Sequence, residues 1–132
     1  MNITREQLLL YAVTDRSWLK GETLYEQVER ALKGGVTLVQ LREKELSEPE
    51  FEAEGRSLLE LCHRYRVPLI INDNVELAER IGADGVHVGQ SDMELTRARK
   101  ILGTDKIIGV TAKTIEQAQA AEKAGADYLG SG

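Results

Sequence analysis

The segment from Leu69 to Asp92 constrains the fold more than any other part of the sequence, because it has the pattern of a strand, a short helix and a second strand. An apolar run at 67–71 is followed by a helical pattern at 75–81, and a second apolar run begins after Asp84. Two strands joined by a helix are typical of parallel pairing. The segment therefore predicts a parallel sheet with helices packed on it.

The same alternation of strand and helix patterns continues through the whole chain. Apolar runs without regular polar alternation are typical of parallel strands that are buried on both faces. The expected strands are Leu8–Val13, Val36–Leu41, Val67–Ile71, a run after Asp84, Lys106–Val110 and Ala126–Leu129. The expected helices run from Gly21 to Gly34, from Ser47 to Tyr65, from Val75 to Ile81, from Leu95 to Leu102 and from Thr114 to Gly125.

Local sequence signals support several of these boundaries. Ser47 and Glu50 form the pattern of a capping box, and Thr114 with Gln117 repeats it. A weak internal repeat also marks the entry to every second strand, as expected for strand–helix units that alternate in pairs. Its three copies are Gly82-Ala83-Asp84, Gly125-Ala126-Asp127 and the looser Gly34-Gly35-Val36-Thr37.

Two folds consist of alternating strands and helices: the doubly wound open sheet and the (β/α)₈ barrel. The open sheet usually has a glycine-rich turn after its first strand, whereas this chain has Thr14-Asp15-Arg16 there. Polar residues instead follow nearly every strand, which is how barrels distribute their sites, and a complete barrel has eight strands and typically about 250 residues. We therefore expect residues 1–132 to form a single α/β domain, an incomplete TIM (β/α)₈ barrel with about six strands and five helices. The last two strands would be missing, so strand edges would be exposed.

Two carboxylates are expected to meet at one end of this sheet. Asp73 follows the third expected strand, and Asp92 follows the fourth. Because neighbouring parallel strands end on the same side, both side chains would face a common space. Mg²⁺ typically takes one or two carboxylates and completes its shell with water and substrate phosphates, so Asp73 and Asp92 are candidate metal ligands. The alternative is that each aspartate caps the helix that follows it.

Cationic and amide side chains follow or end the second and third strands. Arg42 and Lys44 alternate with Glu43, so both can point the same way from an extended segment. Arg can form a fork on phosphate oxygens while Lys acts as a point charge. The alternative is a solvated charged turn. Gln40 and Asn72 carry amides that can bind phosphate oxygens, or that satisfy backbone groups at the strand ends.

The composition argues against several classes of partner. A formal net charge of −5 disfavours broad nucleic-acid binding. No apolar run approaches the ~20 residues of a membrane span, and the N-terminus lacks the apolar core of a signal peptide. The one cysteine, Cys62, excludes an internal disulfide and favours a reducing cytoplasm. We expect Cys62 to be a buried helix thiol, and His87, between two valines, to be structural rather than catalytic.

Five motifs lie at the expected strand ends: Tyr11-Ala12-Val13-Thr14-Asp15, Gln40-Leu41-Arg42-Glu43-Lys44, Ile71-Asn72-Asp73-Asn74, His87-Val88-Gly89-Gln90-Ser91-Asp92 and Gly109-Val110-Thr111-Ala112. Together they resemble the thiamine phosphate synthase family, also called thiamine-phosphate pyrophosphorylase. The resemblance implies a transferase that joins hydroxymethylpyrimidine diphosphate and thiazole phosphate, gives thiamine phosphate and releases pyrophosphate. It also implies a Mg²⁺ requirement and a dissociative mechanism, in which pyrophosphate leaves before the thiazole nitrogen attacks.

The resemblance also assigns roles to individual residues. Thr111 occupies a position where the family commonly has Ser, and its hydroxyl retains the ability to bind diphosphate. The family's thiazole-phosphate site draws mainly on residues that follow the sixth strand. The implied roles are metal binding by Asp73 and Asp92, catalysis and substrate binding by Arg42 and Lys44, and binding of the pyrimidine diphosphate by Gln40, Asn72 and Thr111.

Two other functions are compatible with the sequence. A thiazole tautomerase-like barrel shares the fold but does not need paired metal carboxylates, so Asp73 and Asp92 favour the synthase. A non-catalytic fragment that binds diphosphate weakly is the third hypothesis, and we expect negligible activity from residues 1–132 alone. The expected partners are small-molecule substrates, without nucleic acid or membrane, and a homo-oligomer is compatible with the sequence.

Overall fold

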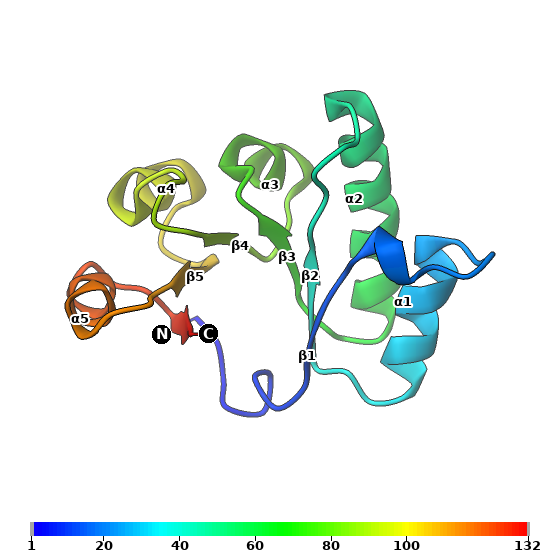
Figure 1. Cartoon of the computed structure of the whole chain (residues 1–132), viewed down its shortest axis with the longest axis horizontal. Coiled ribbons are helices and arrows are strands. Elements are labelled where there is room, and N and C mark those ends of the chain that lie inside the picture. Colours follow the sequence, from blue (N-terminus) through cyan, green and yellow to red (C-terminus); the bar gives the residue numbers. More distant parts are fainter. Residues whose placement is uncertain (1, 132) are drawn as a thin grey trace.

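Six parallel strands form one curved sheet, in which they are arranged in the order they follow in the chain (Figure 1). The computed structural model describes residues 2–131. Sequential order around a sheet is the arrangement of a barrel, whereas a doubly wound sheet reverses its order at a switch point. The expectation of a partial barrel is therefore confirmed at this level. The strands are Tyr11–Val13 (β1), Leu38–Leu41 (β2), Leu69–Asn72 (β3), Gly85–Val88 (β4), Ile107–Thr111 (β5) and Tyr128–Gly130 (β6).

Helices follow the first five strands and cover the outer face of the sheet (Figure 1). A short 3₁₀ helix at Arg16–Trp18 precedes the first of them. None of the helices within residues 2–131 is both long and apolar enough to cross a bilayer. The five α-helices are Leu24–Lys33 (α1), Glu48–Arg64 (α2), Val75–Ile81 (α3), Leu95–Leu102 (α4) and Ile115–Lys123 (α5).

The N-terminal segment corrects one prediction. The expected strand Leu8–Val13 begins only at Tyr11, because residues 5–8 form a turn in which the Leu8 N–H donates to the Arg5 carbonyl (3.1 Å). Residues 2–10 instead cross the opening between β6 and β1 (Figure 1). Ile3 is buried there against the interior of the sheet. Ile3 and Leu8 thus pack against the interior of the sheet, whereas Leu9 and Leu10 of the apolar run are exposed and do not extend the strand.

Side-chain capping explains where the helices begin. Ser47 and Glu50 form the predicted capping box of α2. A second box, between Thr23 and Glu26, starts α1 at Leu24 rather than at the predicted Gly21. Thr114 caps α5, but the side chain of Gln117 accepts from the backbone of Lys113 instead of from Thr114, so the predicted reciprocal box does not form.

The internal repeat has a physical basis in the hydrogen bonds that join neighbouring strands. The carboxylate of Asp84 accepts from the Leu69 N–H (2.7 Å), and that of Asp127 accepts from the Ile108 N–H (2.8 Å). In the looser third copy the hydroxyl of Thr37 accepts from the N–H of Leu10 (2.9 Å). Each copy thus ties the entry of one strand to the entry of the preceding strand.

Alternation along the strands divides the core into two layers. Val39, Leu41 and Ile71 face the helices, where the larger apolar cluster lies. Leu38 and Ile70 face the other way, into a smaller interior cluster near the strand entries. Towards the strand ends the interior positions become polar, so the curvature of the sheet gathers polar side chains there.

The two edge strands expose apolar side chains, as expected for an open barrel. Val13 of β1 is 50% exposed and Leu129 of β6 is 42% exposed, whereas Val39 in the middle of the sheet is fully buried. Within residues 2–131, β1 pairs only with β2 and β6 only with β5. A cavity of about 830 Å³ opens between these edges, and Tyr11 and Tyr128 line it.

Candidate active site

The carboxylates of Asp73 and Asp92 lie together at the carboxyl ends of β3 and β4. Asp73 is exposed, but its partial desolvation raises the pKa of its carboxyl, and the Asp92 carboxyl raises it further through a shared hydrogen bond and like charge. The ammonium group of Lys44 opposes this shift and is therefore also close to the pair. Two adjacent carboxylates beside one cation form a site that favours bound positive charge.

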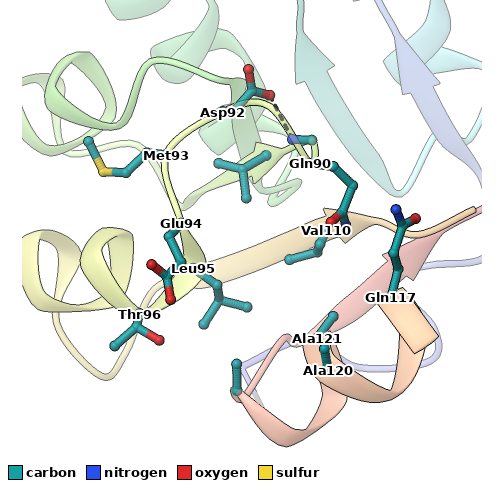
Figure 2. Close-up of a pocket in the computed structure, with 13 residues that line it drawn as sticks. Gln90, Asp92, Met93, Glu94, Leu95, Thr96, Val110, Gln117, Ala120 and Ala121 are labelled. Atoms are coloured by element: carbon teal, nitrogen blue, oxygen red, sulfur yellow. Dashed lines mark hydrogen bonds between the residues drawn. The ribbon is translucent and has the colours of Figure 1, made fainter.

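The backbone around the two aspartates holds them in these positions. Asp73 has a φ of +67°, a left-handed conformation that is uncommon outside glycine, and its N–H donates to the carbonyl of His87 (2.8 Å). The Asp92 carboxylate accepts from the N–H of Gly89 (2.6 Å), as the dashed line in Figure 2 shows. Unusual backbone conformations persist where the surrounding structure determines them, and they cluster at functional sites.

Neither aspartate caps a helix, so the structural alternative for these residues is wrong. The cap of α3 is Asn74, whose side-chain oxygen accepts from the N–H of Leu77 (3.0 Å). The residue before α4 is Glu94, which makes no side-chain capping bond. The side chain of Asp73 thus takes no part in capping α3, the helix that follows it.

Two carboxylate ligands suit a cation whose remaining ligands come from water and from a bound substrate. Across the described residues, 2–131, no group of three or more His, Cys, Asp or Glu side chains is arranged to hold a metal ion. The Asp73–Asp92 pair would supply two carboxylate groups, without sulfur or imidazole. Such a donor set fits Mg²⁺, which retains several waters and binds substrate phosphates, better than Zn²⁺.

The loop after β2 presents Arg42 and Lys44 to solvent, whereas Glu43 between them points inward. The side chain of Glu43 is only 3% exposed and accepts two bonds from the guanidinium of Arg16 (2.8 and 2.9 Å). Arg16 also pairs with Glu54 of α2. Exposure thus alternates along this segment, and Glu43 is a salt-bridge partner.

This cationic loop borders a hollow of about 270 Å³. The segment after β1 forms its other wall, with Thr14 and Asp15 facing Arg42 and Lys44. The hydroxyl of Thr14 accepts from the N–H of Arg42 (2.9 Å), which joins the two walls. The hollow has the size to admit a phosphate group, and its lining includes three cationic side chains, Arg16, Arg42 and Lys44, together with three carboxylates.

Gln40 and Asn72 meet on the interior face of the sheet. The amide nitrogen of Asn72 donates to the side-chain oxygen of Gln40 (2.8 Å), and the amide nitrogen of Gln40 donates to the hydroxyl of Tyr11 (2.9 Å). Gln40 is buried, whereas Asn72 is half-buried beside Asp73. The structure thus brings these two predicted residues together and links them to β1.

The bonds continue from Tyr11 across the opening of the barrel. The hydroxyls of Tyr11 and Tyr128 lie 2.5 Å apart, and the Tyr128 hydroxyl lies 2.9 Å from Nδ1 of His87. Nε2 of His87 lies 2.8 Å from the hydroxyl of Thr111. We call the six side chains linked in this way the interior network; in order they are Asn72, Gln40, Tyr11, Tyr128, His87 and Thr111.

The sequence analysis assigned no role to Tyr11 or Tyr128, and it placed His87 among structural residues. Burial lowers the pKa of His87 more than the nearby Asp92 carboxylate raises it, so the imidazole is held neutral. Burial also raises the pKa of both tyrosines. The period-two alternation of the strands could have indicated that Tyr11 and Tyr128 face the interior.

A second hollow of about 390 Å³ lies between α4 and α5 on the outer side of the sheet (Figure 2). Its lining is mostly small and apolar, with Leu95, Val110 and Ala121 facing one another. Gln90 lies at its edge, and its side chain donates to the carbonyl of Thr111 (2.7 Å). This hollow is separate from the interior network, although the loop that carries Asp92 borders both.

The fold and the site define an α/β protein whose six-stranded parallel sheet is consistent with a partial (β/α)₈ barrel, with paired carboxylates and the Arg42–Lys44 loop at the carboxyl ends of its strands. The sequence model described as "Thiamine monophosphate synthase" matches residues 10–132. The chain therefore belongs to the thiamine monophosphate synthase family.

Individual relatives agree with this assignment. The chain is 57% identical to a thiamine-phosphate synthase of Clostridium acetobutylicum, over 93% of this chain and 58% of the relative. It is 51% identical to that of Caldanaerobacter subterraneus, over 97% of this chain and 60% of the relative. The chain thus spans about 60% of the length of these curated relatives.

A solved structure also resembles this fold. The thiamine phosphate pyrophosphorylase from Pyrococcus furiosus superposes with a TM-score of 0.89 at 38% sequence identity. The superposition covers 97% of this chain and 61% of that one. The partial barrel described here therefore corresponds to a substantial part of that enzyme.

Proposed function

We propose that these residues carry the pyrimidine-diphosphate half of a thiamine phosphate synthase site. The observation that carries the proposal is the contact between Asp73 and Asp92 beside Lys44. The reaction joins hydroxymethylpyrimidine diphosphate to thiazole phosphate and releases pyrophosphate. An enzyme that catalyses this reaction is a transferase. We place the protein in the cytoplasm, where its one cysteine, Cys62, would remain reduced. The thiol of Cys62 is buried, and burial raises its pKa to about 12.

Asp73 and Asp92 would hold Mg²⁺ in this proposal. When bound, the ion would neutralise charge on the diphosphate oxygens and so favour departure of the leaving group. The support is the donor set itself, two neighbouring carboxylates that form no group of three with another His, Cys, Asp or Glu among residues 2–131. The raised pKa of Asp73 indicates that the site is electrostatically incomplete without a cation.

Arg42 and Lys44 would bind the diphosphate and stabilise the charge that it gains as its bond to carbon breaks. Preorganised cations are most effective where charge develops in the transition state. The Arg16–Glu43 pair supports this role, because it fixes the loop with both cations facing outward. Gln40 and Asn72 would hold the polar edge of the aminopyrimidine, and Thr111 would donate to the diphosphate.

A chimera tests the proposal under conditions in which the acceptor site is present. Residues 1–132 would replace the matching segment of the Clostridium acetobutylicum relative, with which they share 57% identity. We expect formation of thiamine phosphate and pyrophosphate that requires Mg²⁺, and loss of turnover in Asp73→Ala. Asp105→Ala, which removes a carboxylate from an exposed loop, is the matched control.

Two results would contradict the proposal. Unchanged turnover in Asp73→Ala would refute the metal assignment. Isomerised thiazole phosphate without release of pyrophosphate would identify a tautomerase-like activity instead. For residues 1–132 assayed alone we expect negligible turnover, because the resemblance places most of the thiazole-phosphate site after the sixth strand.

A further inference from the structure

The interior network takes one side chain from each of the six strands, and half of it has no assigned role. Asn72, Gln40 and Thr111 belong to the proposed binding site. The members that connect them are Tyr11, Tyr128 and His87. In residues 2–131, no buried side-chain nitrogen or oxygen lacks a hydrogen-bond partner, so the network is fully satisfied.

The amides fix the direction of donation at one end of the network. The nitrogen of Asn72 donates to the oxygen of Gln40, and the nitrogen of Gln40 donates to the oxygen of Tyr11. Amide nitrogens can only donate. The Tyr11 oxygen is therefore an acceptor in this bond, and its own hydrogen is available for the oxygen of Tyr128, 2.5 Å away, although either hydroxyl can be the donor between the two tyrosines.

The same direction then passes through the imidazole. When Tyr128 accepts from Tyr11, the hydrogen of Tyr128 is directed to Nδ1 of His87. Nδ1 must then be the unprotonated nitrogen, and a neutral imidazole carries its proton on Nε2. Nε2–H donates to the oxygen of Thr111. The pKa of His87, lowered by burial, agrees with this neutral form.

The consequence concerns the hydroxyl of Thr111. With its oxygen accepting from His87, its hydrogen is free to point away from the network. In the opposite tautomer Thr111 would have to donate its hydrogen to Nε2 of His87, and it would present only lone pairs to an approaching ligand. An anionic oxygen would be attracted in the first case and repelled in the second.

Glycine at position 109 makes this arrangement possible. Gly109 lies directly between His87 of β4 and Tyr128 of β6 in the strand register. A Cβ at this position would lie 2.0 Å from Cζ of Tyr128. The absence of a side chain lets the tyrosine ring lie over the backbone of β5 and reach an imidazole two strands away.

We propose that Tyr11, Tyr128 and His87 are positioning residues that direct the hydroxyl hydrogen of Thr111 towards a diphosphate oxygen. The inference rests on the proposed function, because it assigns diphosphate as the ligand of that hydroxyl. None of the three residues needs to touch the reacting atoms. Their role is to fix the direction of hydrogen-bond donation, which runs from Tyr11 towards Thr111 rather than in reverse.

The tautomer of His87 is the first test, and it does not depend on activity. The sequence has two histidines, so ¹⁵N nuclear magnetic resonance of a His63→Asn variant reports on His87 alone. We expect a neutral ring protonated at Nε2 in this variant, and loss of the hydrogen-bonded signature of Nδ1 when Tyr128→Phe is added. A ring protonated at Nδ1 would overturn the inference.

Binding of inorganic pyrophosphate with Mg²⁺, measured by calorimetry, is the second test. In His87→Gln the longer side chain places its amide nitrogen near the position of Nε2, within reach of Thr111. In His87→Asn the shorter side chain reaches only the position of Nδ1, next to Tyr128. We expect the affinity to fall at least about tenfold in His87→Asn, which is the loss of one hydrogen bond to a charged oxygen. His87→Gln should stay within about threefold of the parent chain.

The outcomes separate the inference from the proposed function. If the parent chain binds pyrophosphate and both variants bind it equally well or equally poorly while remaining folded, the positioning role is overturned alone. If the parent chain does not bind pyrophosphate with Mg²⁺, the proposed function fails, and the assignment of diphosphate to Thr111 fails with it.

Discussion

Replacing Asp73 with Asn should stabilise the chain in the absence of a divalent cation and abolish its stabilisation by Mg²⁺. Partial desolvation and the Asp92 carboxyl raise the pKa of Asp73, so at neutral pH the folded state holds a carboxylate that it disfavours. A folded-state pKa above the unfolded value makes stability fall as pH rises from the unfolded pKa to the folded one, and the loss persists at higher pH. Asn removes this loss, and it tolerates a φ of +67° at least as well as Asp.

The expected size of each effect follows from exposure and mass action. Asp73 is exposed, so solvent screening limits the gain without metal to about 0.5–1 kcal/mol. In the parent chain, Mg²⁺ at ten times its dissociation constant should add about 1.4 kcal/mol. A protein of this size shifts its Tm by about 3–5 °C per kcal/mol. We therefore expect Asp73→Asn to melt about 2–5 °C higher than the parent without metal, and the parent to gain about 4–7 °C with it.

Thermal unfolding followed by circular dichroism, with and without Mg²⁺, measures both effects. Asp105→Asn is the matched control, because it removes the same charge from an exposed loop and should leave the response to Mg²⁺ unchanged. A lower Tm of Asp73→Asn without metal would show that the two carboxylates do not repel each other. An undiminished response of Asp73→Asn to Mg²⁺ would refute the metal site.

Three further substitutions test the scaffold around the site. Asp127→Asn should lower the free energy of unfolding by about 1–3 kcal/mol at neutral pH. Hydrogen bonds to the Asp127 carboxylate outweigh its burial and lower its pKa. In urea titrations the difference in stability between the parent and the variant should therefore shrink as pH falls through this lowered pKa. Gly109→Ala should displace the ring of Tyr128 and cost about 1–3 kcal/mol in urea unfolding, so an unchanged midpoint would contradict the packing described. Arg16→Gln should lower stability by about 1–3 kcal/mol by leaving the carboxylate of Glu43 unpaired, and adding Glu43→Gln should restore part of it in a double-mutant cycle.

Helix positions could be predicted because local chemistry determines them. Val75–Ile81 and Leu95–Leu102 have the bounds that the sequence indicated, since glycines follow both and apolar periodicity defines their length. The first strand could not be delimited, because Leu8 packs into the interior cluster from a turn, and an apolar run does not distinguish a turn from a strand.

The carboxylate pair could be predicted, whereas the interior network could not. Asp73 and Asp92 follow adjacent parallel strands, and the topology alone brings such positions to one edge. The contact between Tyr11 and Tyr128 joins residues 117 positions apart. It depends on the curvature of the whole sheet and on the missing side chain of Gly109, neither of which a local pattern records.

A crystal structure of the chain with Mn²⁺ and inorganic pyrophosphate tests the central claim most directly, because Mn²⁺ prefers the same oxygen ligands as Mg²⁺ and can be located by its anomalous scattering. The account predicts one ion bound by the Asp73 carboxylate, the Asp92 carboxylate or both, with pyrophosphate and water completing its shell and Lys44 close to the phosphate oxygens. An ion bound elsewhere, or carboxylates of residues 73 and 92 turned away from each other with pyrophosphate bound, would contradict it.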